Sequence, residues 1–316
     1  MPVSITKNKK EKDVIEQMFH HAFPNEEVCE ITELTEGYFN VAYKISSNQR
    51  SVICKIAPSA QTDIMTYENN IMFSEVDSMK MVAEKTDVPV AKILFYDNSH
   101  TICDSDYFFM EILEGRSFSG LENEISKEEK EHIYYGMGKY TRMLNDISGN
   151  KFGYYGQPDK QGTNWYEVFR SMMEDVYADA TNKAIDMPVT REYLLQLLEK
   201  DKAIFEEVKQ SKFVHWDIWA GNVFVDAGEI TGIIDFERCL WADELMEVGF
   251  RTYGREKSFF AGYGIEKLDV EQERRASWYD VYLCLLMSME ADYRQYENKD
   301  ISDWARGMVE KWVAEQ

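Results

Sequence analysis

One short stretch in the second half of the chain concentrates polar residues that are able to do chemistry. Residues 213–237 read FVHWDIWAGNVFVDAGEITGIIDFE. Two apolar runs, 223–225 and 232–234, predict two short strands joined by a turn at 226–228. The ends of this hairpin carry four polar side chains: His215, Asp217, Asn222 and Asp235. Two carboxylates and an amide brought together in this way predict a divalent-cation site with a spare base.

The residue types and their spacing favour phosphoryl transfer. Asp217 is followed by Asn222 five residues later and by Asp235 thirteen residues after that, which is the spacing of a protein-kinase catalytic loop and its metal-binding Asp. We expect Asn222 and Asp235 to ligate Mg²⁺, because amide and carboxylate oxygens are hard ligands. Asp217 is the candidate catalytic base for an acceptor hydroxyl. For His215 we expect a structural role in the loop.

The beginning of the chain predicts a small antiparallel sheet behind an amphipathic helix. Apolar residues at helical spacing predict the helix over 8–22. Strand-like segments follow at 29–34, 41–46 and 51–57, and short turns separate them. Three consecutive strands with such short connections are typical of an antiparallel sheet.

Two features of this sheet are candidates for binding the phosphates of a nucleotide. The turn between the first two strands contains one glycine, and the backbone of Gly37, Tyr38 and Asn40 is placed to cover phosphates. Lys55 lies on the third strand between apolar residues, so its ammonium needs a counter-charge. The sequence therefore predicts a phosphate-binding lysine beneath a covering loop.

A helix predicted over 63–84 offers two partners for Lys55. Glu68 and Glu75 are seven residues apart and are expected on nearly the same side of this helix. We prefer Glu75, as in the lysine–glutamate pair of kinases, and leave Glu68 open as the alternative.

The first half closes with two further strands, predicted at 92–96 and 107–112. The second of them breaks at Gly115, where we expect the first domain, 1–113, to pass into the second, 114–316. The strand end offers backbone groups that are expected to pair with an adenine edge, at Met110, Glu111 and Ile112.

The second domain is predicted to be mainly helical. Helical periodicity marks segments at 126–145, from 164 onward, 191–209, 278–293 and 301–313, and the Gly-rich segment 149–163 is predicted to be a loop. A sheet-containing lobe followed by a helical lobe with one central hairpin is an α+β arrangement.

Composition narrows the functional class. The chain has 316 residues, 44% of them apolar, and a formal charge of −22, which repels nucleic acids and attracts cationic partners. The five cysteines are widely spread without a C-x-x-C pair, and we expect reduced thiols in a cytoplasmic protein. Neither a signal peptide nor a run of eighteen apolar residues is present, so no membrane partner is expected. Composition leaves open whether the protein is a monomer or a dimer.

These motifs resemble those of the aminoglycoside phosphotransferase family, kinase-like enzymes that include choline kinases. The resemblance runs from about Ile31 to the end and is most specific in HWDIWAGN, at 215–222, and IIDFE, at 233–237. It implies a bilobal protein-kinase-like fold, with Asp217 as base, Asn222 and Asp235 on Mg²⁺, and Lys55 on the phosphates of ATP; GTP is left open. The single glycine of the covering loop and the missing A-P-E segment favour a small-molecule kinase over a protein kinase.

The acceptor is expected to be a small cationic molecule. Acidic residues that would bind ammonium groups are Glu174, Asp175, Asp179, Asp243, Glu244 and Glu247. A choline-like or amino-alcohol acceptor, held by aromatic residues such as Trp165, Tyr166 and Trp241, is an alternative, and so is a sugar. A kinase-like nucleotide-binding protein without transfer activity is the alternative from a different functional class.

Overall fold

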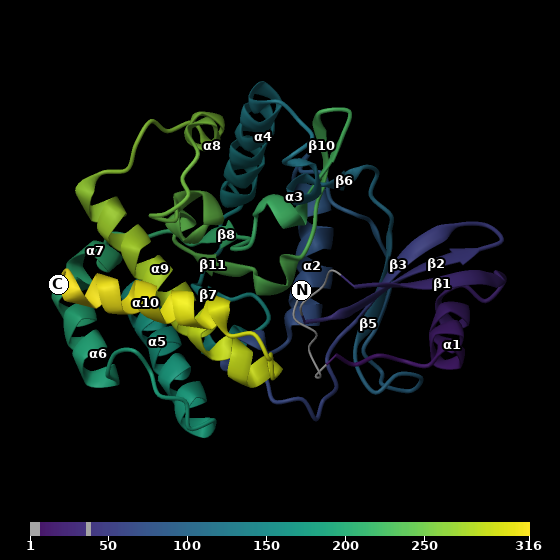
Figure 1. Ribbon diagram of the computed structural model, residues 1–316, viewed down its shortest axis with the longest axis horizontal. Helices are drawn as coiled ribbons and strands as arrows, with labels where there is room; N and C mark the ends of the chain where they lie inside the picture. Colours follow the sequence, from purple (N-terminus) through teal and green to yellow (C-terminus); the bar gives the residue numbers. More distant parts are fainter. Residues whose placement is uncertain (1–6, 36–38) are drawn as a thin grey trace.

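The computed structural model describes residues 7–35 and 39–316 of the chain. The expected α+β architecture is confirmed, because an antiparallel sheet near the N-terminus is followed by a mainly helical part (Figure 1). Gly37 and Tyr38 of the expected phosphate-covering loop lie outside the described residues.

The first part is a five-stranded antiparallel sheet with one helix on its outer face. The strands stand in the order β1-β2-β3-β5-β4, and their bounds are β1 Val28–Leu34, β2 Val41–Ser47, β3 Ser51–Ile56, β4 Ile93–Asp97 and β5 Tyr107–Glu111. Helix α1, Lys12–Ala22, buries Ile15, Met18 and Phe19 against this face. Alternation along β3 buries Val52, Cys54 and Ile56 on the same face and turns Lys55 to the other.

The helix expected over 63–84 begins later than its apolar pattern suggested. Residues Thr66–Glu68 form a separate 3₁₀ turn, η1, and Asn70 has a left-handed backbone with φ of 59°. Helix α2 therefore runs only from Ile71 to Lys85. The consequence is that Glu68 is not on the helix, and Glu75 alone of the two candidates faces the sheet from α2.

Helix α2 is shared by the two parts of the molecule. Its buried residues Met72, Val76, Met79 and Val82 belong to the core that also contains Phe108 and Met110 of β5 and the buried side chains of the C-terminal part. Figure 1 shows α2 standing between the sheet and the helices of the second part. Although the sheet ends at Glu111, close to the expected domain boundary at 113/114, the apolar core continues across it.

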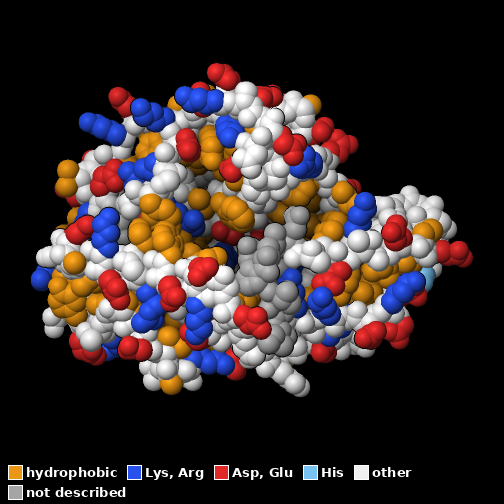
Figure 2. Space-filling view, in the orientation of Figure 1, with side chains coloured by type: hydrophobic (Ala, Val, Ile, Leu, Met, Phe, Trp, Pro, Cys, Tyr) orange, Lys and Arg blue, Asp and Glu red, His pale blue; other side chains and the backbone are white. Residues whose placement is uncertain are grey.

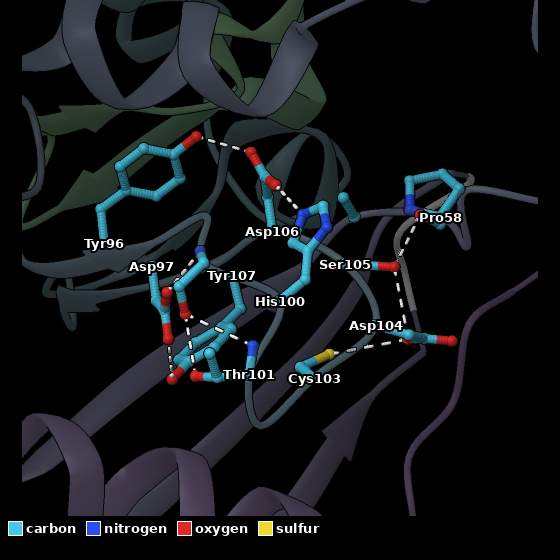
Figure 3. Close-up of polar contacts among 12 residues, drawn as sticks. Pro58, Tyr96, Asp97, His100, Thr101, Cys103, Asp104, Ser105, Asp106 and Tyr107 are labelled. Atoms are coloured by element: carbon cyan, nitrogen blue, oxygen red, sulfur yellow. Dashed lines mark hydrogen bonds and ion pairs between the residues drawn. The ribbon is translucent and has the colours of Figure 1, made fainter.

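A polar network ties down the loop between β4 and β5 (Figure 3). Tyr107 donates its hydroxyl to Asp97 at 2.9 Å, and Asp106 accepts from Tyr96 at 2.6 Å and contacts His100 at 2.7 Å. Every one of these carboxylates is used within the loop. The loop thus closes one end of the sheet and offers no free acidic cluster.

The connection into the second part is a tight approach of two backbones. The short strand β6, Arg116–Ser117, pairs with β9, Val223–Asp226, and β9 pairs with β10, Glu229–Ile233. Just before β6, Gly115 has φ of +89°, and a Cβ added there would lie 2.2 Å from the carbonyl oxygen of Val225. A side chain at this position is therefore excluded. The hairpin predicted within 213–237 is therefore paired directly with the segment that connects the two parts of the molecule.

Helices build the rest of the second part, with a small β7-β11-β8 sheet among them. The bounds are α3 Phe118–Leu121, α4 Lys127–Asn145, β7 Gly153–Tyr154, η2 Pro158–Lys160, α5 Trp165–Asn182, α6 Arg191–Lys200, α7 Lys202–Glu206, β8 Lys212–Val214, η3 Ala220–Asn222, η4 Phe236–Arg238, β11 Leu240–Ala242, η5 Glu244–Met246, η6 Val248–Phe250, α8 Lys257–Tyr263, α9 Val270–Arg294 and α10 Asp300–Ala314.

Two helix predictions in this part need correction. The helix expected over 191–209 is interrupted at Asp201, which separates α6 from α7. Helix α9 begins eight residues before the expected start at 278, because Asp269 and Gln272 form a capping box ahead of it.

Within residues 7–35 and 39–316, none of the helices has the length and the apolar character needed to cross a bilayer.

Candidate active site

Lys55 is the centre of an ion-pair cluster between the two parts of the molecule. Its Nζ lies 2.7 Å from Oε2 of Glu75 on α2 and 2.6 Å from Oδ1 of Asp235. The lysine side chain is only 12% exposed, so its charge is held by these partners and not by water. The preferred partner Glu75 is therefore in contact with Lys55, whereas Glu68 pairs with Arg294 of α9.

A third carboxylate joins this cluster. Glu237 places Oε2 3.5 Å from Nζ of Lys55, and oxygens of Glu75, Asp235 and Glu237 all lie within 4.8 Å of one another. Burial raises the pKa of Glu237 to about 8, with the charge of Asp235 adding to the effect. Burial is the largest single effect on Asp235 and raises its pKa, but the charge and the hydrogen bond of Lys55, together with the charge of Arg238, outweigh it and hold the pKa of Asp235 below its usual value. With its raised pKa, Glu237 is mostly protonated at pH 7 as long as the cluster holds no metal ion; a divalent cation would displace that proton, because three carboxylates offer more negative charge than one ammonium balances.

Asn222 is oriented for the ligand role that its amide oxygen is expected to have. Its Nδ2 donates to the carbonyl oxygen of Asp217 at 2.9 Å and to Oδ2 of Asp217 at 3.0 Å. Its backbone carbonyl accepts from Ile234 at 3.0 Å, so Asn222 lies beside the residue that precedes Asp235. With the amide nitrogen used by the loop, its Oδ1 accepts no hydrogen bond from any residue that the structure describes. That oxygen suits a hard cation such as Mg²⁺.

Asp217 combines burial with a nearby positive charge. Burial raises the pKa of its carboxyl group to about 6, while the charge of Arg238 acts in the opposite direction. One oxygen accepts from Asn222, as described, which leaves the other for a ligand. A half-buried carboxylate whose pKa lies near neutrality is suited to accept a proton from a hydroxyl.

His215 joins the catalytic loop to the strand that ends in Asp235, which is the structural role expected for it. Its Nε2 donates to the carbonyl of Ile234 at 3.1 Å, and its Nδ1 accepts the backbone N–H of Asp217 at 3.2 Å. Burial lowers the pKa of the imidazole to about 4, which keeps it neutral. The neutral ring with hydrogen on Nε2 satisfies both contacts.

Glu247 binds the backbone of the same loop through both of its carboxylate oxygens. Its Oε1 accepts the backbone N–H of His215 at 2.9 Å and its Oε2 that of Trp216 at 3.0 Å. Asn145 of α4 donates to Oε1 at 3.2 Å as well. Trp216 has a left-handed backbone, with φ of 67°, so this part of the loop is held in a costly conformation by its neighbours. Glu247 was expected to bind a cationic acceptor, but its oxygens are used by the loop and by Asn145.

The covering loop reaches the cluster through Asn40. This buried side chain donates from Nδ2 to Oε2 of Glu237 across 197 positions of sequence. Its Oδ1 is buried without a hydrogen-bond partner among the described residues. The contact fixes the first described residues after the loop over the carboxylate cluster.

The strand end expected to bind adenine is only partly available. The N–H of Glu111 donates to the carbonyl of Lys92 at 3.0 Å, and Met110 is paired with both β3 and β4. Ile112 lies just beyond the strand and is 39% exposed. The backbone groups of Met110 and Glu111 that the sheet uses are not available to pair with adenine. The groups that stay available for this expected role lie at the end of β5, next to Ile112.

Most of the acids expected to bind a cationic acceptor are engaged elsewhere. Asp175 pairs with Lys160, Glu174 with Arg170 and Arg191, Asp179 accepts from Thr66, Asp243 binds Arg275 and Tyr279, and Glu247 binds the loop. The aromatic candidates are also built into the protein: Trp165 and Tyr166 are buried, and Trp241 stacks on Tyr155. The sequence did not show these contacts, because they depend on which helices meet.

Two functional candidates were missed by sequence reasoning. No functional role was predicted for Glu237, yet it belongs to the carboxylate cluster. Arg238 donates to Glu290 of α9 at 3.1 Å and its charge acts on Asp217. The only local signal was their position directly after Asp235.

Figure 2 shows a hollow between the two parts of the molecule with acidic side chains at its floor.

Comparisons with known proteins agree with this geometry. The family model of the Phosphotransferase enzyme family (APH) matches residues 30–276. No curated protein sequence matches the chain. A putative fructosamine-3-kinase from Haemophilus somnus 129PT has a similar structure, with a TM-score of 0.69, 16% identity, and coverage of 94% of this chain and 96% of that one.

Two aminoglycoside phosphotransferases have similar structures as well. A thermostable mutant of APH(4)-Ia, in a ternary complex with AMP-PNP and hygromycin B, has a TM-score of 0.67 at 18% identity and covers 95% of this chain and 98% of its own. APH(2")-IIa, in a ternary complex with streptomycin and ATP, has a TM-score of 0.63 at 14% identity, and the match covers 97% of this chain and 96% of that one. At these identities the likeness confirms the bilobal protein-kinase-like fold. Since the family model spans most of the chain, the protein belongs to the Phosphotransferase enzyme family and is a small-molecule kinase that acts on hydroxyl groups.

Proposed function

We propose that this kinase uses ATP and Mg²⁺ to phosphorylate a hydroxyl group of a small molecule. The observation that carries the proposal is the contact of Lys55 with both Glu75 and Asp235, at 2.7 and 2.6 Å, beside the loop of Asp217, whose Asn222 bonds both to Asp217 and to the residue before Asp235. A lysine, a metal-binding carboxylate and a base brought together from distant segments are the parts that phosphoryl transfer requires. The neighbour bound to AMP-PNP supports a nucleotide as donor, and GTP stays open as an alternative to ATP.

Each residue has a defined task in this reaction. Asn222, Asp235 and Glu237 offer the oxygens that would hold Mg²⁺, which neutralises phosphate charge when bound. Lys55 binds the nucleotide phosphates and is oriented by Glu75. Asp217 accepts the proton of the acceptor hydroxyl, and the hydroxyl oxygen forms a bond to the γ-phosphorus. The bond between the γ-phosphorus and the bridging oxygen of the β-phosphate breaks, so the products are ADP and a phosphate ester.

The acceptor is proposed to be small and to carry at least one hydroxyl. A cationic acceptor remains supported by the net charge of −22, which attracts cations at long range. Of the acids expected to bind its ammonium groups, Asp243 and Glu247 use their oxygens inside the protein. Net charge influences how fast a ligand arrives, and contacts decide which ligand stays bound.

Substitution of Asp217 tests the proposal. We expect Asp217→Asn to retain Mg²⁺-dependent binding of ATP and to lose phosphoryl transfer by roughly 10²- to 10⁴-fold, as for removal of a general base. Transfer is measured as ADP release with a panel of aminoglycosides, amino alcohols, sugars and hydroxy acids. The matched control is Asp226→Asn, which changes an exposed aspartate at the turn of the same hairpin. Equal turnover by wild type and Asp217→Asn would reject the base assignment.

The competing function, nucleotide binding without transfer, has its own signature. It predicts Mg²⁺-dependent ATP binding by the wild-type protein and no ADP release with any member of the acceptor panel.

A further inference from the structure

An arginine at the end of the long helix α9 stacks on an aromatic ring that stands just before β2. The guanidinium carbon of Arg294 lies 3.5 Å from the centre of the Phe39 ring, which is the spacing of two planar groups in van der Waals contact. Arg294 is 4% exposed and Phe39 is 8% exposed, so water does not reach between them. The attraction between a cation and a ring is strongest when both groups are desolvated. This contact therefore ties the first part of the molecule to the second.

Arg294 is a fixed point of the second part. Its guanidinium forms a buried ion pair with Glu68 of η1, whose other oxygen accepts the backbone N–H of Met65 at 2.7 Å. The turn η1 is bound to α5 in its turn, because Thr66 donates its backbone N–H and its hydroxyl to Asp179, each at 2.7 Å. Separation of a buried ion pair is costly, so Arg294 cannot follow a movement of the sheet.

The segment that Arg294 holds lies over the phosphate-binding centre. Asn40, which follows Phe39, donates to the carboxylate of Glu237, and that carboxylate lies 3.5 Å from Nζ of Lys55. Further along β2, Ala42 is the residue that pairs with Lys55. Phe39 is therefore next to a residue that the sequence predicts to cover phosphates, and close to the strand position opposite the phosphate-binding lysine.

The end of α9 supports the carboxylate cluster as well. Glu290 stands one helical turn before Arg294, on the same face of the helix, and accepts from Arg238 at 3.1 Å. Arg238 follows Glu237 directly in η4. The last two turns of α9 thus contact both the segment before β2 and the segment after the metal-binding carboxylates. One helix determines the separation of these two segments.

We propose that Arg294 is a positioning residue for nucleotide binding, which holds Phe39, and with it Asn40, at the place from which the phosphates are covered. Arg294 acts through Phe39 and does not touch the nucleotide. The inference rests on the proposed function, because it requires that a nucleotide binds beside Lys55. A segment that is held in place before the ligand arrives loses less freedom on binding, so the contact acts on nucleotide affinity.

Two substitutions remove the contact from its two sides. Phe39→Leu removes the ring and keeps an apolar side chain, and it leaves the pair of Arg294 and Glu68 intact. Arg294→Lys keeps the charge that Glu68 requires and removes the planar group that stacks on the ring. The double variant combines both changes. If Arg294→Lys does not fold, Phe39→Leu alone still tests whether the ring positions the segment.

A second arginine of α9 provides a matched control. The guanidinium of Arg274 lies 5.0 Å from the centre of the Trp312 ring, and Arg274 pairs with Asp201 at 2.6 Å, at the opposite end of the helix. Arg274→Lys therefore weakens a contact of the same kind away from the sheet. Affinity is measured by fluorescence titration with N-methylanthraniloyl-ATP and Mg²⁺, which needs no acceptor. Thermal unfolding without nucleotide verifies that each variant is folded.

We expect the dissociation constant of the Mg²⁺ nucleotide to rise roughly tenfold in Phe39→Leu and in Arg294→Lys, as for loss of a desolvated cation–π contact. The double variant should bind about as weakly as either single variant, because both changes remove one and the same contact. Arg274→Lys should bind the nucleotide as tightly as the wild type, even where its melting temperature is lower.

The possible contrary results have different meanings. An unchanged dissociation constant in either single variant, with the protein folded, rejects the positioning role. Effects that multiply in the double variant show that the two residues act independently, which rejects the route through Phe39. An equal loss of affinity in Arg274→Lys shows that general stability, and not the position of the segment, is responsible. Absence of nucleotide binding by the wild type rejects the proposed function itself, and the inference with it.

Discussion

The carboxylate of Glu247 accepts the backbone N–H of Trp216 at 3.0 Å, one residue before Asp217. Together with the contact to His215, it connects the loop that carries Asp217 to the segment between η5 and η6. A carboxylate that is 1% exposed and accepts from two consecutive N–H groups controls the path of the backbone between them.

Glu247→Ala is expected to damage both stability and turnover. Removal of an acceptor for His215, Trp216 and Asn145 leaves buried donors unpaired, which should lower the free energy of unfolding by about 2–4 kcal/mol. Because the loop then loses its anchor, kcat should fall while the KM for ATP changes little. Urea unfolding and steady-state kinetics measure the two effects. Glu310→Ala, an exposed change on α10, should alter neither; an unchanged kcat in a folded Glu247→Ala protein would contradict the anchoring role.

The same residue should make stability depend on pH. Burial raises the pKa of Glu247 to about 7 in the folded protein, whereas the unfolded chain has the ordinary value of 4.5. Between these values the folded state binds more protons, so the free energy of unfolding falls as the pH rises. The stability that protonated Glu247 contributes is fully present below the unfolded pKa of 4.5 and is lost as the pH rises above the folded pKa of about 7. It amounts to about 3 kcal/mol.

Urea titrations at pH 5, 6, 7 and 8 measure this slope. Other buried groups titrate in the same range, so the informative quantity is the difference between wild type and Glu247→Gln, whose side chain does not titrate. The wild-type curve should fall more steeply. Parallel curves would mean that Glu247 does not titrate in this window.

The pairing of Lys55 with Glu75 should be visible in nucleotide kinetics. Glu75→Gln removes the charge that holds the ammonium at 2.7 Å, so we expect the KM for ATP to rise roughly tenfold. Glu84→Gln, an exposed change on the same helix, is the control. A KM for ATP that is equal in both variants would show that Asp235 alone positions Lys55.

The rejected partner Glu68 should matter for folding instead. It is 2% exposed and pairs with Arg294, which is 4% exposed. Glu68→Ala leaves the arginine charge buried and should cost about 3–5 kcal/mol of unfolding free energy. Glu124→Ala removes one member of the exposed Arg116–Glu124 pair and should leave the melting temperature unchanged. Equal effects of the two substitutions would argue that burial of the Glu68 pair adds no stability.

The sequence was informative where structure is local. The hairpin at 223–233 was predicted because apolar runs and a turn signal lie within eleven residues. The positions of Asp217, Asn222 and Asp235 follow from that hairpin, so this part of the site could be inferred without coordinates. Lys55 was predicted because it stands between apolar residues on a strand, where an ammonium group needs a counter-charge.

The remaining features depend on contacts between distant segments. The late start of α2 follows from the left-handed backbone of Asn70, which no apolar pattern reveals. Glu237 enters the cluster because Asn40 and Lys55 arrive from the sheet. Whether an acid such as Asp243 is free or paired depends on Arg275 of α9. Periodicity describes one element at a time and is silent on such pairings.

The shared packing of α2 has a consequence for how the enzyme would open. Lys55 is attached to the sheet, whereas Glu75 is attached to a helix whose apolar side chains belong to one continuous core with the second part. A close-packed core resists being pulled apart, so α2 cannot travel freely with the sheet. Phe108 and Met110 of β5 belong to the same core, so widening of the cleft must separate packed side chains, and the Lys55–Glu75 distance would change wherever β3 moves relative to α2. The length of this one ion pair is therefore a gauge of closure, readable in any structure of the protein with a nucleotide bound.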